Sequence, residues 1–213
     1  MTFPTDSDIP YDLLMKIQNG TMAYQYKGIP TLKNPFDLAL YPLLFQQLRP
    51  RSVIEIGSNA GGGAVWMADQ LAMIGVDAQI HSMDINPVKG VAHQRVTFPL
   101  GDGRNPAAIF SAEFVGSLPR PLLVVEDADH NYVTTKAVLD HFAPFLEIGE
   151  YILVEDGIVG DMRVAANYDG GPTRAIDEFL ATHKGSFEID RFYCDYFGRN
   201  VTWNVNGYLR KAG

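Results

Sequence analysis

The feature that most constrains this chain is the alternation of short apolar runs with helical segments from residue 51 onward. Strands that alternate with helices form right-handed βαβ units, which build a parallel sheet with helices on both faces. Two late runs have room only for a hairpin between them. We therefore expect a Rossmann-like α/β fold whose mostly parallel seven-stranded sheet ends in an antiparallel edge hairpin. The expected strands span residues 52–56, 78–84, 96–100, 121–126, 151–155, 187–193 and 201–209.

Charge and cysteine content exclude several classes of protein. Seventeen Lys and Arg face 25 Asp and Glu, a formal net charge of −8, whereas a nucleic-acid grip needs clustered positive charge. The single cysteine, Cys194, excludes an intramolecular disulfide and a multi-cysteine zinc site. Residues 1–8 show no secretory signal, and no run approaches the ~18 apolar residues of a membrane span. We expect a cytoplasmic protein with no nucleic-acid or membrane partner.

A glycine-rich turn follows the first apolar run. It reads Glu55-Ile56-Gly57-Ser58-Asn59-Ala60-Gly61-Gly62-Gly63. Glycines let the backbone turn sharply and approach a ligand, and the next helix directs its N-terminal N–H groups at that ligand. The dinucleotide fingerprint G-x-G-x-x-G would need glycine at position 59, where asparagine stands. The pattern E-x-G-x-x-x-G instead resembles motif I of class I S-adenosylmethionine-dependent methyltransferases.

Two acidic residues end the next two strands, at the edge where open α/β sheets bind ligands. Asp84 follows the second strand, and its two oxygens suit the vicinal hydroxyls of a ribose. Asp102 follows the third strand and resembles the adenine-contacting residue of that methyltransferase class. A glycine-rich loop that merely turns the chain is the alternative. The predicted cofactor-binding residues are Glu55, Gly57, Ser58, Asn59, Gly61, Asp84, Ile85, Asp102 and Gly103.

An acidic cluster is predicted where the fourth and fifth strands end, in Glu126-Asp127-Ala128-Asp129-His130 and Glu155-Asp156. Adjacent parallel strands lie about 4.8 Å apart, so Asp127, Glu155 and Asp156 should meet beside the cofactor. Crowded carboxylates repel one another unless a cation or protons neutralise them, and hard oxygen ligands suit Mg²⁺ or Ca²⁺. Helix N-capping by these side chains is the alternative.

A divalent ion in this cluster would bind a substrate hydroxyl and lower its pKa. A neighbouring base would then accept the proton as the oxygen attacks the methyl group of the cofactor. Asp129 and His130 are both candidates for this base, and capping is the alternative role of His130.

Several further segments carry a more specific pattern. They are the entry segment 28–38, the run Asp127-Ala128-Asp129-His130, the strand 151–156 that ends in V-E-D, the segment 171–180 with G-P-x-x-A-x-x-E-F-L, and the closing segments 187–191 and 204–209. Together they resemble the cephalosporin hydroxylase / rhamnosyl O-methyltransferase family of metal-dependent proteins with the class I methyltransferase fold. The resemblance covers about residues 25–210. Val205 departs from it, because the family has proline there.

The resemblance implies an O-methyltransferase that uses S-adenosylmethionine and Mg²⁺ (or Ca²⁺ or Mn²⁺) on a hydroxyl of a small natural product or sugar. It implies metal ligation by Asp127, Glu155 and Asp156, with Asp129 as the base and His130 as the alternative. Residues 1–35 are expected to form a helix and a flap over the active site, and residues 36–213 the methyltransferase domain. We also expect a homo-oligomer.

Other readings stay open at this point. A nucleotide-dependent oxidoreductase on a Rossmann-like sheet is one, although Asn59 argues against it. A non-catalytic, cofactor-binding subunit that assists a partner enzyme is another. Residues 157–170 are expected to form a substrate lid, with an ordinary surface loop as the alternative. Tyr26 and Lys33 are candidates for substrate contacts from the flap.

Overall fold

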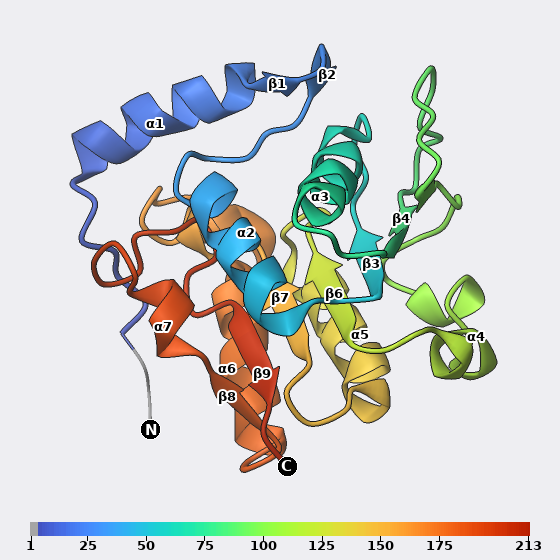
Figure 1. Cartoon of the computed structure of the whole chain (residues 1–213). Coiled ribbons are helices and arrows are strands. Elements are labelled where there is room, and N and C mark those ends of the chain that lie inside the picture. Colours follow the sequence, from blue (N-terminus) through green and yellow to red (C-terminus); the bar gives the residue numbers. More distant parts are fainter. Residues whose placement is uncertain (1–3) are drawn as a thin grey trace.

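A seven-stranded sheet runs through the middle of the protein (Figure 1). The structure, a computed structural model, describes residues 4–213, so the first three positions of the expected segment 1–35 lie outside it. The strands of this sheet are β3 (Ser52–Ile56), β4 (Gln79–Met83), β5 (Val96–Thr97), β6 (Leu122–Glu126), β7 (Tyr151–Val154), β8 (Phe187–Ile189) and β9 (Tyr208–Lys211). Their order is β5-β4-β3-β6-β7-β9-β8. The first five are parallel, and β9 pairs antiparallel with β7 and β8.

Helices cover both faces of this sheet (Figure 1). The longer ones are α2 (Asp37–Leu48), α3 (Gly62–Met73), α5 (Tyr132–Phe142) and α6 (Gly171–Thr182); short turns are η1 (Pro106–Ala108), α4 (Ala112–Ser117), η2 (Ala143–Phe145), η3 (Gly157–Val159), η4 (Ala165–Tyr168) and α7 (Arg191–Cys194). Every residue of β3, β6 and β7 is buried, as expected for strands covered on both faces. Among residues 4–213, no helix is long and apolar enough to cross a bilayer. The expected α/β fold is confirmed.

The end of the chain differs from the sequence prediction. The predicted strand 187–193 stops at Ile189, because the Asp190 carboxylate accepts the N–H of Phe192 and starts α7 there. The predicted strand 201–209 begins only at Tyr208. Its antiparallel edge is confirmed, but a short helix and a buried irregular segment join β8 to β9 in place of a hairpin. Cys194 is a buried core residue, although it lies in α7.

The N-terminal segment consists of α1 (Tyr11–Ala23) and a flap made by β1 (Gln25–Tyr26) and β2 (Ile29–Pro30) (Figure 1). The amphipathic run 9–17 predicts a shorter helix. The observed helix runs on through Gly20, a weak helix former, because it is held by tertiary packing. Leu14 is fully buried in a small apolar cluster with Ile158 and Trp203.

A buried carboxylate ties α2 to the irregular segment before β9. Asp37 is 1% exposed and accepts hydrogen bonds from the Thr202 hydroxyl, the Asn34 amide and the Trp203 N–H, the last at 3.1 Å. Burial raises the pKa of Asp37 to about 7, although the hydrogen bonds act in the opposite direction. This contact fixes the position of Trp203, which lines the cavity described below.

An Asp37→Asn variant tests this buried carboxyl. Its pKa is 3.8 in an exposed chain and about 7 in the folded protein, so the folded state binds more protons between these values and loses stability as the pH rises. We expect this group to contribute a fall in the free energy of unfolding of up to about 1.4 kcal/mol per pH unit, and the variant to lack that part of the slope. Urea denaturation from about pH 5 to about pH 8 measures it; identical slopes would contradict the assignment.

Candidate active site

Backbone hydrogen bonds continue past the ends of the central strands and align the site residues at one edge of the sheet. The Asp127 N–H donates to the carbonyl oxygen of Ile56 at 2.8 Å, and the Glu155 N–H donates to that of Glu126 at 2.9 Å. The residues that follow β3, β6 and β7 are therefore held side by side. This is the edge at which open α/β sheets bind ligands.

A cavity of about 610 Å³ opens at this edge, within the range of small-molecule and cofactor sites. Two of the predicted site residues do not line it: Gly61 is the N-cap of α3, and Glu155 is buried, with 5% of its surface exposed. The predicted residues that line it are Glu55, Gly57, Ser58, Asn59, Asp84, Ile85, Asp102, Gly103, Asp127, Asp129, His130 and Asp156.

The glycine-rich turn is the point of closest backbone approach. Gly57 has φ +110°, and a Cβ on it would lie 1.9 Å from the carbonyl oxygen of Asp127, so a side chain does not fit there. A Cβ on Gly62 would lie 2.2 Å from the carbonyl oxygen of Pro30 in the flap. The turn is thus pressed against the end of β6 on one side and against the flap on the other.

Asp84 fastens the turn from the neighbouring strand. Its Oδ2 accepts the N–H of Asn59 at 2.8 Å, and its Oδ1 accepts the N–H of Asn86 at 2.8 Å. Asn59 has φ +47°, a left-handed conformation that asparagine adopts more readily than most residues. Each Asp84 oxygen keeps a lone pair for a ligand.

Glu55 lies at the base of the turn. The Ser82 hydroxyl donates a hydrogen bond to the Glu55 carboxylate, and Ser58 Oγ lies 2.7 Å from Ser82 Oγ. Burial raises the pKa of Glu55 to about 8, and the neighbouring Lys33 partly opposes this shift. Glu55 therefore carries a proton more readily than an exposed glutamate.

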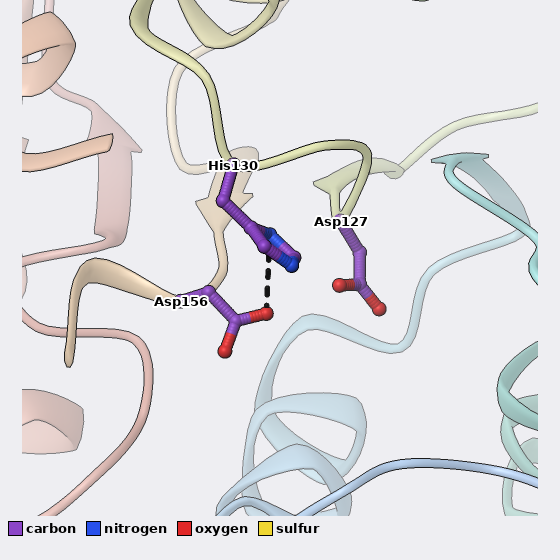
Figure 2. Close-up of side chains that lie close together, drawn as sticks. All are labelled: Asp127, His130 and Asp156. Atoms are coloured by element: carbon purple, nitrogen blue, oxygen red, sulfur yellow. Dashed lines mark ion pairs between the residues drawn. The ribbon is translucent and has the colours of Figure 1, made fainter. Parts of the chain in front are cut away.

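Asp127, His130 and Asp156 point toward one another at the cavity wall (Figure 2). One ligand atom from each lies within 4.8 Å of the other two, and His130 Nδ1 is 3.3 Å from Asp156 Oδ2. Within residues 4–213, this is the group whose geometry suits a metal ion. His130 and Asp156 both have φ +57°, an uncommon left-handed conformation that recurs at functional sites.

The charges of this group influence one another. Burial raises the pKa of Asp127 and of Asp156, although Lys33 and His130 act in the opposite direction. Burial lowers the pKa of His130, but the surrounding carboxylates outweigh that effect and raise it above its ordinary value. The pattern is that of acidic groups crowded together with too little positive charge.

Glu155 lies deeper and faces Lys33. Its Oε1 accepts a hydrogen bond from Lys33 Nζ at 2.5 Å and another from the Tyr41 hydroxyl. The same ammonium lies 2.7 Å from Asp127 Oδ2. From the sequence, Lys33 is only a candidate for a substrate contact, and Tyr41 is not a candidate at all. Both residues lie far before the acidic cluster in the chain, and no characteristic spacing links them to it.

Asp129 stays at the rim of the cavity, where its side chain is 47% exposed. Its Oδ1 accepts the N–H of Asn131 at 3.1 Å, and Arg104 lies 3.5 Å from its Oδ2. Burial alone would raise the pKa of Asp129, but Thr134, the Asn131 N–H and Arg104 together outweigh it and hold the pKa below its usual range. Arg104 is a lining residue that the sequence analysis did not single out.

The N-terminal segment contributes to the cavity lining. Gln18, Thr21 and Met22 of α1 line it, as do Thr31 and Leu32 after the flap. The Thr21 hydroxyl is buried without a hydrogen-bond partner in the described chain. This part of the lining therefore carries polar groups that do not belong to the cofactor motif.

Residues 157–170, the expected substrate lid, lie outside the cavity wall, and their role as a lid stays a prediction. None of them lines the cavity in the described structure. They pack beside the N-terminal segment, with the Arg163 guanidinium 4.2 Å from the centre of the Tyr11 ring. The ring of Tyr168 lies 5.9 Å from that of His130, which lines the cavity.

The sheet order and the helices on both faces define a class I methyltransferase fold. The solved structure described as "cmcI-D160 Mg-SAM" superposes with a TM-score of 0.73 and 24% identity, over 90% of this chain and 78% of that one. A putative O-methyltransferase from Klebsiella pneumoniae superposes with a TM-score of 0.58 and 17% identity, over 100% of this chain and 92% of that one.

Sequence comparison gives the family. The model of Rhamnosyl O-methyltransferase/CmcI matches residues 18–212, and the chain belongs to this family. A Rhamnosyl O-methyltransferase of Mycobacterium leprae (strain TN) is 29% identical over 190 residues, which cover 86% of this chain and 81% of the relative. One from Mycobacterium bovis (strain BCG / Pasteur 1173P2) is 26% identical, over 86% and 76%. The family resemblance found in the sequence is confirmed.

Gly57→Ala tests the close approach of the turn to β6. The added Cβ would collide with the Asp127 carbonyl group in a conformation that alanine rarely adopts. We expect the free energy of unfolding to fall by roughly 2–5 kcal/mol in urea denaturation. Gly116→Ala is the matched control, because no atom would contact its Cβ within 4 Å and it lies in α4. The control should be neutral or more stable by up to about 1 kcal/mol; equal losses in both variants would contradict the expectation.

Proposed function

We propose that this protein is an O-methyltransferase that moves the methyl group of S-adenosylmethionine to a hydroxyl of a small molecule, with Mg²⁺ in the acidic group. The carrying observation is that one cavity holds both the glycine-rich turn with Asp84 and the group of Asp127, His130 and Asp156. Membership in a family named for O-methyltransferases supports this activity over the nucleotide-dependent oxidoreductase.

The proposed cofactor site lies on the turn side of the cavity. Asp84 would accept hydrogen bonds from the ribose hydroxyls with the lone pairs that the N–H groups of Asn59 and Asn86 do not use. Asp102 lines the same side, where the adenine would lie. Gly57 keeps the backbone open to the ligand. The fold neighbour described with Mg and SAM supports a cofactor of this kind.

The donor set fits a hard divalent ion. Asp127 and Asp156 present carboxylates to the cavity, and Glu155 keeps its Oε2 free because Lys33 and Tyr41 both use Oε1. We propose these three acidic residues as ligands, with His130 placed to add a nitrogen ligand. Bound there, the ion would supply Lewis-acid polarisation of the acceptor hydroxyl, and the cofactor would supply the methyl group.

The chain itself would supply the base. Asp129 lies at the cavity rim, and Arg104 and the Asn131 N–H orient its carboxylate while leaving it half-exposed. His130 is the alternative, but its Nδ1 is already paired with Asp156. We therefore propose Asp129 as the group that accepts the hydroxyl proton.

The acceptor side of the cavity is proposed to be the part lined by the N-terminal segment. Gln18 and Thr21 bring polar side chains, and Met22 and Leu32 bring apolar ones. A wall of this mixed character suits a molecule with both hydroxyl groups and apolar faces, such as a sugar or a hydroxylated natural product. Rhamnosyl O-methyltransferases among the relatives support a sugar as acceptor.

Asp84→Asn tests the cofactor site. Loss of the charge weakens the hydrogen bonds to the ribose, so the dissociation constant of S-adenosylhomocysteine should rise by about 10–100-fold in isothermal titration. Asp77→Asn is the control, because Asp77 precedes the same strand and its side chain is 84% exposed. It should leave the constant unchanged. An unchanged constant in Asp84→Asn would remove Asp84 from the site.

Asp127→Asn tests the metal-dependent step. We would measure transfer of labelled methyl groups to a panel of sugars and hydroxylated natural products with Mg²⁺ present. The variant should lose activity by more than about 100-fold while it still binds S-adenosylhomocysteine, and EDTA should abolish the activity of the wild type. Asp140→Asn on α5, far from the cavity lining, should keep full activity. Cofactor binding without transfer to any acceptor would favour the non-catalytic, cofactor-binding subunit.

A further inference from the structure

Lys33 is a buried cation that the proposed chemistry does not use. Its side chain is 3% exposed, and its Nζ lies 2.7 Å from Asp127 Oδ2 and 2.5 Å from Glu155 Oε1. The same Nζ lies 5.6 Å from the centre of the Tyr41 ring. Burying an ammonium is costly unless opposite charges surround it, so this position is built for a cation.

The surroundings of Lys33 are strongly acidic. Asp156 lies near the pair that it contacts, and its charge adds to those of Asp127 and Glu155. Among the lysines and arginines of residues 4–213, Lys33 is the one that forms an ion pair with Asp127 or Glu155. Its ammonium is therefore the main fixed positive charge within the cluster.

The metal proposed above would need the same two carboxylates. A divalent ion bound to Asp127 and Glu155 would lie close to the ammonium, and two cations at such a separation repel each other strongly in a buried site. We propose that Lys33 is the resident counter-ion of the carboxylate cluster and that it competes with the divalent metal for Asp127 and Glu155. This inference rests on the proposed function.

Displacement of the Lys33 ammonium by a metal would also affect the flap, because Lys33 and the flap belong to one continuous segment. Lys33 lies three residues after β2, and the flap is held on its other side by Tyr26, whose hydroxyl donates to Asp69 at 3.0 Å. Lys27 also pairs with Asp69, at the exposed surface. Metal that displaces the Lys33 ammonium would therefore loosen one attachment of the flap and leave the contacts with Asp69 intact.

The test is a Lys33→Met variant of the full chain, stripped with EDTA and titrated with Mn²⁺ by electron paramagnetic resonance. We expect it to bind Mn²⁺ at least about tenfold more tightly than the wild type. Without metal it should melt at a lower temperature, because Asp127 and Glu155 lose their partner, and Mn²⁺ should raise its melting temperature more than that of the wild type. Lys27→Met is the matched control and should bind Mn²⁺ as the wild type does.

Equal or weaker Mn²⁺ binding by Lys33→Met would overturn the inference, as would a variant that stays unfolded even with Mn²⁺. A variant that folds only when Mn²⁺ is present would support it, because the metal then replaces the missing ammonium. Titration of S-adenosylhomocysteine separates this result from the proposed function. Cofactor binding with no Mn²⁺ binding by wild type or variant would overturn both the inference and the metal part of that function. Loss of Mn²⁺ binding in Lys33→Met alone would overturn only the inference.

Discussion

Several carboxylates converge where β3, β6 and β7 end, and their mutual repulsion in a partly buried place is the constraint on which the rest of the site depends. The sheet cannot avoid this crowding, because parallel strands bring their carboxyl ends to one edge. Positive charge has to come from elsewhere in the chain. The N-terminal segment supplies Lys33, and the loop after β6 supplies His130.

The two sides of the cavity come from different parts of the chain. The proposed cofactor side is made by loops that follow the strands, where Gly57 and Asp84 are fixed by backbone hydrogen bonds and close packing. The side lined by α1 and the flap is held by side-chain contacts such as that between Gln18 and Trp203. Substitutions in the second side can therefore leave the backbone contacts of the first side in place.

Much of the fold follows from local pattern. Apolar runs without alternation predicted β3, β6 and β7, and residues after them, such as Asp127 and Asp156, lie at the cavity because strand ends share an edge. Prediction failed where a tertiary contact overrides local preference: α1 continues past Gly20, and the capping of α7 by Asp190 ends β8 early.

The site was predicted less completely than the fold, for a similar reason. Asp127, Asp129, His130 and Asp156 follow one another at strand ends, so their place could be inferred from sequence. The partners of Glu155 and Asp129 could not be inferred, because Tyr41 and Arg104 lie on other elements at no characteristic spacing. The depth of Glu155 behind Lys33 likewise depends on three-dimensional packing.

The tie between Lys33 and Glu155 spans 122 residues, and that between Pro4 and Asn200 spans 196. During synthesis α1 and the flap leave the ribosome before several of the groups that hold them are made, such as Glu155, Asn200 and Trp203. Contacts at such separations form slowly, since the loop must close before they contribute. The sheet and the loops that follow its strands can form around β3 and β6 before residues 4–35 have a surface to pack against. The cavity is therefore completed late, when Trp203 has been made and α1 can pack against it.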